Sequence, residues 1–200
     1  MKLFCADLEG VFLPEVWIEV ALKVGIEELK LTTRDISDYD VLMKKRLSIL
    51  KENNLKIKDI TDVIATIDPL EGATQTLDWI RERAQIIILS DTYEEFAMPM
   101  MKKLNYPALL CHSLTIENDG TIKDYNIRIE SQKKKAVQAF KNMNYTVTAF
   151  GDSYNDTQMI LEADNGFFYN PPESVIKDFP KIPVTKNYDE VKTMIESLLE

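Results

Sequence analysis

Short apolar runs alternate with amphipathic stretches along this chain, and their order constrains the fold more than any other feature. The runs typical of strands are 2–6, 85–90, 108–111, 146–150 and 166–169. Helical patterns fill most of the segments between them. Strands that alternate with helices are typical of βαβ units, in which helices cover both faces of a parallel sheet. The sequence therefore predicts an α/β fold with a Rossmann-like, mostly parallel sheet.

The connection between the first two predicted strands is unusually long. A crossover usually needs one helix, whereas more than fifty residues separate Pro14 from Leu70, and three amphipathic stretches lie among them. We expect a small helical cap at 14–70, inserted after the first strand and able to cover a site. The core is then expected to consist of 1–13 and 71–200.

Local signals set some boundaries within this plan. Pro14 suits the start of a helix, and Gly25 suits its end. Asp119-Gly120 is a favoured turn pair, so a β-hairpin is predicted from 114–117 and the residues from Ile122 onward.

Charge and hydropathy exclude several classes of partner. The net charge is −9, and no basic tract is longer than three residues, the length of Lys133-Lys134-Lys135. Nucleic acids and anionic membranes are therefore not expected as partners. No apolar run reaches the length of a membrane span, and the first residues lack the form of a signal peptide. We expect a cytoplasmic protein.

Cysteine and histidine are scarce, which limits the possible chemistry. Cys5 and Cys111 lie in apolar runs and form no CxxC pair, so reduced, buried thiols are expected. His112 is the only histidine, which excludes metal sites built from several histidines. It follows an apolar run, and a packed or loop-anchoring role is its simplest interpretation.

Two acidic clusters follow predicted strands. Asp7 and Glu9 come directly after the first strand, and Asp152 and Asp156 follow the run 146–150. Ligands of open α/β sheets bind at the carboxyl ends of the strands. Carboxylates that meet there can hold a hard cation such as Mg²⁺. Each acid could instead cap the next helix, but two clusters together favour the cation site.

A hydroxyl and a lysine complete a candidate phosphate site. Ser90 ends the strongest strand signal, and Asp91-Thr92 is expected to open a helix whose N–H groups could bind phosphate. Ser90 or Thr92 could equally be a helix cap. Lys133 and its two neighbours open a later helix, where one lysine could face an anion and the others solvent.

The predicted cap contributes two further candidates. Arg46 interrupts an apolar stripe between Met43 and Leu47, so it either snorkels to solvent or binds an anion such as a substrate carboxylate. Glu15 could bind an ammonium group or merely favour a helix N-terminus. Asn155 could donate to a substrate or fix Asp152.

Together these groups are suited to phosphoryl transfer. A cation and a lysine would screen the phosphate charge so that a carboxylate can attack it, and a nearby acid would protonate the leaving oxygen.

The motifs resemble those of the haloacid dehalogenase superfamily, within its phosphoserine phosphatase group. They occur in the family order along the whole chain. The segments Pro14-Glu15, 43–47 and 88–92 are most similar to the subgroup that also transfers phosphate to homoserine. The four motifs are 7–11, Ser90-Asp91-Thr92, Lys133 and 151–156.

The resemblance implies a role for each catalytic candidate. Asp7 would be the nucleophile and a Mg²⁺ ligand. Glu9 would be the acid and base, with its main-chain carbonyl on the metal. Asp152 would complete the protein ligands, and Asp156 would support them.

The resemblance also implies how the substrate binds. Ser90, the Asp91 N–H and Lys133 would hold the phosphate, with Asn155 nearby. Glu15 would take the substrate ammonium. Arg46 would take its carboxylate. The implied substrate is phosphoserine, homoserine is a second acceptor, and a homodimer is one possibility.

Glu9 departs from the usual superfamily pattern, which has Asp two residues after the nucleophile. Its carboxyl lies one methylene farther out, so the alignment of water could differ and an alcohol could accept the phosphoryl group. Two alternatives remain at this point: a phosphatase for another small phosphomonoester, and a signalling receiver domain. The long insertion and the acidic cluster 151–156 argue against a receiver.

Overall fold

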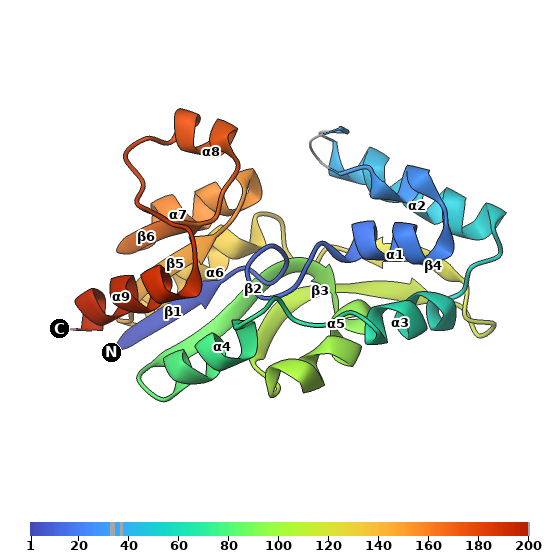
Figure 1. The fold of residues 1–200 in the computed structure, drawn as a ribbon. Helices are drawn as coiled ribbons and strands as arrows, with labels where there is room; N and C mark the ends of the chain where they lie inside the picture. Colours follow the sequence, from blue (N-terminus) through green and yellow to red (C-terminus); the bar gives the residue numbers. More distant parts are fainter. Residues whose placement is uncertain (33–34, 37, 200) are drawn as a thin grey trace.

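A seven-stranded sheet organises the part of the chain that the computed structural model describes, which is residues 1–32, 35–36 and 38–199. The strand order is β4-β3-β2-β1-β5-β6-β7 (Figure 1). Every neighbouring pair is parallel except β3 and β4. The strands are β1 (Lys2–Ala6), β2 (Gln85–Tyr93), β3 (Ala108–Ile116), β4 (Ile122–Asn126), β5 (Thr146–Gly151), β6 (Asn165–Tyr169) and β7 (Val184–Thr185). The predicted mostly parallel α/β sheet and its hairpin are confirmed.

Helices cover both faces of this sheet (Figure 1). The α-helices are α1 (Val16–Val24), α2 (Tyr39–Glu52), α3 (Ile57–Ala65), α4 (Ala73–Arg81), α5 (Glu94–Met101), α6 (Gln132–Asn142), α7 (Thr157–Glu162), α8 (Glu173–Asp178) and α9 (Tyr188–Leu199). Short 3₁₀ turns are η1 (Glu27–Lys30), η2 (Lys102–Leu104) and η3 (Tyr154–Asp156). None of these described helices has the length and hydropathy that a membrane span requires.

The central strand β1 separates two hydrophobic cores, because successive side chains of a strand point to opposite faces. Phe4 and Ala6 pack in the core that includes α4, α5 and α9. Leu3 and Cys5 pack in the core that includes α6, α7 and α8. Burial on both faces explains why β1 is apolar without alternation.

The insertion between β1 and β2 consists of α1, η1, α2 and α3, as the three amphipathic stretches predict. Its buried residues Val20, Met43 and Ile64 belong to the same core as Phe4. A backbone hydrogen bond of 2.9 Å from Ile57 N–H to Gly120 O joins α3 to the turn between β3 and β4. The insertion is therefore packed against the sheet and its hairpin. Its division into a cap and a core at the predicted boundaries stays a prediction.

Two predicted helix starts are wrong. Pro14 does not begin α1, which starts at Val16, because the chain first turns tightly and Leu13 N–H bonds Leu8 O at 3.0 Å. Asp91-Thr92 does not open a helix. Strand β2 continues to Tyr93, whose backbone pairs with His112 of β3, and α5 begins only at Glu94.

Other elements are longer than predicted or were not predicted. The run 108–111 and the first hairpin strand form one continuous β3. The short edge strand β7 and the helices around it, α8 and α9, had no distinct signal. Cys5 is buried as expected, whereas Cys111 is only partly buried, and both are free thiols among the described residues.

Candidate active site

A cavity of about 460 Å³ lies where β1, β2 and β5 end and the inserted helices face them. This is the sheet edge at which ligands of open α/β folds bind. Most of the predicted site residues line it. The cavity is lined by Asp7, Glu9, Glu15, Trp17, Thr32, Tyr39, Leu42, Arg46, Ser90, Asp91, Thr92, Tyr93, Asp152, Ser153, Tyr154 and Asn155.

Asp7 is held rigidly at the base of this cavity. Its N–H donates to Phe150 O of the neighbouring strand at 3.0 Å. Its carboxyl Oδ1 accepts from Leu8 N–H at 2.8 Å and lies 3.0 Å from Lys133 Nζ. Only 4% of Asp7 is exposed. Backbone and side chain are both fixed, so the carboxylate has a defined orientation.

Asp156 organises the second acidic cluster from a fully buried position. Its Oδ2 accepts from the N–H groups of Asp152 and Ser153 at 3.0 and 3.1 Å. Its Oδ1 accepts from Lys133 Nζ at 2.8 Å. Asp156 therefore supports the loop that carries Asp152.

Two glycines allow these carboxylates to lie so close to the backbone. A Cβ on Gly10, whose φ is +77°, would lie 2.5 Å from the carboxyl carbon of Asp152. A Cβ on Gly151 would lie 2.2 Å from the carboxyl carbon of Asp156. Any side chain at either position would displace an acid of the site.

Lys133 is the lysine that faces the site. Its side chain is 4% exposed and lies 2.8 Å from Asp156, 3.0 Å from Asp7 and 3.6 Å from Asp91. Burial lowers the pKa of Lys133, but the carboxylates of Asp156, Asp7 and Asp91 outweigh that effect and raise it well above its usual value. Lys134 instead pairs with Glu162 on the protein surface.

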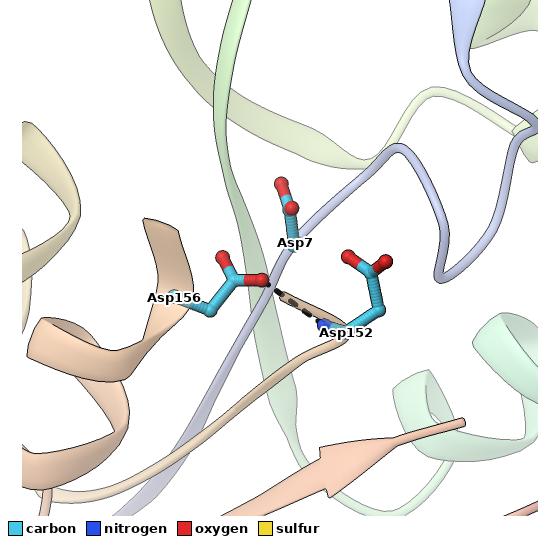
Figure 2. A group of neighbouring side chains, drawn as sticks. All are labelled: Asp7, Asp152 and Asp156. Carbon is cyan, nitrogen blue, oxygen red and sulfur yellow. Dashed lines mark hydrogen bonds between the residues drawn. The ribbon is translucent and has the colours of Figure 1, made fainter. Parts of the chain in front are cut away.

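The cluster of Asp7, Asp152 and Asp156 fits a divalent cation. Each offers an oxygen within 4.8 Å of the others, and Figure 2 shows their carboxyls converging from two segments. When six ligand atoms surround Mg²⁺ at about 2.0–2.1 Å from the ion, adjacent ligand atoms lie about 2.9 Å apart and opposite ones about 4.1 Å apart. Three carboxylates and one ammonium leave a surplus of negative charge. Both oxygens of Asp156 already accept protein hydrogen bonds, so Asp156 is better suited to supporting the cluster than to binding the cation.

The surplus of negative charge also affects the pKa of Asp7. Burial raises the pKa of Asp7 well above its usual value, and the carboxylates of Asp156 and Asp152 add to this, whereas Lys133 opposes it. The carboxylate form of Asp7 therefore gains from a bound cation.

Glu9 combines burial with two donors. Val16 N–H donates to Glu9 Oε2 at 2.9 Å, and the Thr92 hydroxyl also donates to its carboxyl. Burial, followed by repulsion from Glu15, raises the pKa of Glu9 to about 7, although both donors lower it. A carboxyl with that pKa can both give and take a proton near neutral pH.

Ser90 and Asp91 lie in strand β2. Ser90 is 2% exposed, and its Oγ accepts from Thr92 N–H at 3.2 Å. Helix α5 begins only at Glu94, so neither Ser90 nor Thr92 caps it. Burial raises the pKa of Asp91, but Lys133, His112 and Gln132 outweigh it and hold that pKa below its usual range. Asp91 is therefore a carboxylate at the cavity wall.

Arg46 does not snorkel to solvent, because it is only 6% exposed. Its Nη2 donates to Leu31 O at 2.7 Å, and its guanidinium stacks over the Trp17 ring at 4.5 Å. Its buried Nε has no hydrogen-bond partner among the described residues. A buried cation at a cavity wall with an unused donor favours the anion-binding interpretation.

Glu15 and Asn155 both line the cavity. Glu15 is the residue before α1, and its side chain makes no capping hydrogen bond within the described structure. It lies near Glu9, whose pKa it raises. Asn155 accepts from Ser153 Oγ and donates to Asp91 Oδ2 at 3.4 Å.

Several lining residues had no signal in the sequence. Trp17 and Tyr39 had appeared only as members of apolar helix faces, and Tyr93 lay beyond the predicted end of its strand. Tyr39 and Tyr93 share a hydroxyl hydrogen bond of 2.7 Å between α2 and β2. Aromatic residues at helical spacing predict a core, and nothing in that spacing marks which of them border a cavity. His112 is buried behind Asp91, at 3.6 Å, in agreement with its predicted packed role.

Two known proteins are similar to this chain over most of its length. Phosphoserine phosphatase ThrH of Pseudomonas aeruginosa is 52% identical over 192 residues, which cover 96% of this chain and 94% of the relative. A phosphoserine phosphatase of Pseudomonas syringae pv. tomato is 50% identical, with 96% of this chain and 81% of the relative covered.

A solved structure supports the fold. It is the phospho-aspartyl intermediate analogue of a phosphoserine phosphatase, and it matches with a TM-score of 0.76 at 21% identity, over 98% of both chains. The model of the haloacid dehalogenase-like hydrolase family matches residues 2–164. The chain belongs to the haloacid dehalogenase-like hydrolases.

Proposed function

We propose that this protein is a Mg²⁺-dependent phosphoserine phosphatase that works through an aspartyl phosphate on Asp7 and can also transfer the phosphoryl group to homoserine. The observation that carries the proposal is one cavity with two different ends. One end has the Asp7–Lys133 pair beside an acidic cluster. The other has the buried guanidinium of Arg46 with an unused donor. The two relatives named above support the same substrate.

Phosphate is proposed to bind at the end near Asp7. Ser90 Oγ, the Asp91 N–H and Lys133 would donate to its oxygens, with Asn155 beside them. Asp7, Asp152 and the main-chain carbonyl of Glu9 would hold Mg²⁺, and Asp156 would support this arrangement from behind. The cation would screen the charge between the carboxylate and the phosphate.

The amino-acid end of phosphoserine would face the inserted helices. Arg46 would bind its carboxylate, where the Trp17 stack keeps the guanidinium in place. Glu15 would bind its ammonium. This pair of opposite charges suits an amino acid better than a simple phosphate ester.

The first chemical step forms a bond between an Asp7 oxygen and phosphorus while the bond from phosphorus to the serine oxygen breaks. Protonated Glu9 gives its proton to the leaving serine oxygen. In the second step Glu9 takes a proton from water, whose oxygen attacks phosphorus and frees Asp7. A homoserine hydroxyl in place of water would give phosphohomoserine. The extra methylene of Glu9 is our proposed reason why an alcohol can compete.

A cytoplasmic protein with small-molecule partners fits the proposed reaction, and a homodimer stays a prediction from the resemblance.

The direct test of this proposal is a product assay by ³¹P NMR with phosphoserine and Mg²⁺, with homoserine present or absent. We expect serine and inorganic phosphate in its absence, and phosphohomoserine in its presence. Chelation of the metal should stop both reactions. Failure to release phosphate would refute the proposed phosphatase activity. Hydrolysis without formation of phosphohomoserine would refute the proposed transfer to homoserine.

Arg46→Ala tests recognition of the amino acid. We expect KM for phosphoserine to rise by about 10- to 100-fold, because one of two opposite charges is removed, with a much smaller change for phosphoethanolamine, which lacks the carboxylate. Arg83→Ala is a matched control, since Arg83 stacks on Trp79 at 4.3 Å on the exposed surface. Equal effects of Arg46→Ala on both substrates would count against carboxylate binding.

The pKa of Glu9 predicts a pH dependence for the first step. The acid form is needed to protonate serine, and the pKa is raised to about 7, so that form is present below this pH and lost above it. The single-turnover rate of serine release should therefore fall about tenfold per pH unit well above pH 7. Glu9→Gln should be slow at every pH. A flat wild-type profile between pH 6 and 9 would contradict this role.

A further inference from the structure

Gln132 is a buried polar residue that the proposed reaction does not use. It is the first residue of α6, directly before Lys133, and it is 3% exposed. A buried side-chain amide is costly unless its donors and acceptor are satisfied. Its partners therefore indicate what it does.

All of these partners belong to the wall of the phosphate end or to the residues behind it. Gln132 Nε2 donates to Ser90 O at 2.5 Å and to Asp91 Oδ1 at 3.0 Å. Its Oε1 accepts from Arg128 Nη2 at 3.1 Å. Because an arginine can only donate, this contact fixes which end of the amide faces Ser90.

His112 closes the network from the neighbouring strand. Its Nδ1 accepts from Arg128 N–H at 3.2 Å, and its Nε2 lies 3.4 Å from Gln132 Nε2. The side chains of His112 and Gln132 are both buried. The nitrogen of the Gln132 amide is held by Ser90 and Asp91 and its oxygen by Arg128, so the amide cannot rotate without breaking these contacts.

The contact with Ser90 O determines the direction of another group. Ser90 C=O and Asp91 N–H belong to one planar, trans peptide unit, so they point in opposite directions. A carbonyl fixed on Gln132 forces the Asp91 N–H to point away from Gln132. That N–H is one of the donors proposed to bind phosphate.

The sheet itself does not fix this peptide in a regular ladder. The pairing of β2 with β3 is interrupted between Leu89 and Tyr93, and the pairing of β2 with β1 ends at Ile88. Ser90 and Asp91 therefore lie where β2 extends beyond regular pairing. Where the ladder is disrupted in this way, contacts other than sheet pairing must fix the orientation of the peptide.

We propose that Gln132 is a positioning residue that locks the Ser90–Asp91 peptide so that the Asp91 N–H faces the phosphate. It also ties the Asp91 carboxyl by Oδ1, which leaves Oδ2 toward Lys133, at 3.6 Å, and Asn155. This role rests on the proposed phosphate site. It adds a link between the end of β2 and the start of α6, the two segments that carry the phosphate donors.

The experiment replaces Gln132 with Met, which keeps the length of the side chain and removes the amide. Gln138→Met is the matched control, because Gln138 lies on the same helix and donates to Glu162 away from the cavity. Inorganic phosphate and L-serine are used separately as product inhibitors of the Mg²⁺-loaded enzyme. Phosphate meets only the phosphate end, and serine meets the amino-acid end.

We expect Gln132→Met to raise the Ki of phosphate and the KM of phosphoserine by about tenfold, as for loss of one oriented hydrogen bond to a charged group. The Ki of serine should stay unchanged, and Gln138→Met should resemble the wild type. An unchanged phosphate Ki would overturn the proposal. Equal weakening of phosphate binding and serine binding would also overturn the proposal, because that result would indicate a general distortion of the site.

A second variant covers the case in which Gln132→Met does not fold. Gln132→Asn keeps the amide on a side chain that is one methylene shorter. This variant should weaken phosphate binding in the same selective way. Isothermal titration of phosphate into the Mg²⁺-loaded wild type and variant separates this inference from the proposed function. Selective loss of phosphate affinity would support the positioning role even if phosphoserine proved not to be the substrate. Equal affinities would refute it.

Discussion

The rest of the site depends on one interaction, the pairing of the buried Lys133 ammonium with the carboxylates of Asp7 and Asp156. It joins three segments that are far apart in the sequence: the end of β1, the start of α6 and the loop after β5. Removing one partner of such a buried group leaves an uncompensated charge, which costs on the order of 3–5 kcal/mol. The fold and the candidate chemistry are therefore coupled at this point.

The same ion cluster explains why the site should take a cation and an anion together. The carboxylates outnumber the ammonium, so a cation relieves their repulsion, and a phosphate then meets a site that is no longer strongly negative. Glu9 lies apart from this cluster, with its own donors Val16 and Thr92. Its pKa of about 7 follows from burial and from Glu15, so the proposed acid and the proposed nucleophile have separate environments.

Much of this arrangement could be predicted from the sequence, because strand ends and their polar residues are local patterns. The positions of Asp7 and Asp152 follow from apolar runs and the topology they imply, whereas only the family resemblance distinguished Lys133 from Lys134. The course of Ser90–Thr92 could not be predicted, since pairing with β3 and burial of Tyr93 overrode the helix-start signal. Gln132 escaped prediction, and the pattern left two orientations open for Arg46, because both depend on contacts between residues far apart in the chain.

The central claim is that Asp7 carries the phosphoryl group. Rapid acid quenching of the Mg²⁺-loaded enzyme during turnover of phosphoserine, followed by borohydride reduction and peptide mass spectrometry, tests it directly. Borohydride converts an acyl phosphate to an alcohol, so the account predicts homoserine at position 7 and at no other carboxyl, with none in Asp7→Asn. Labelling at another residue, or unmodified Asp7 during steady turnover, would contradict it.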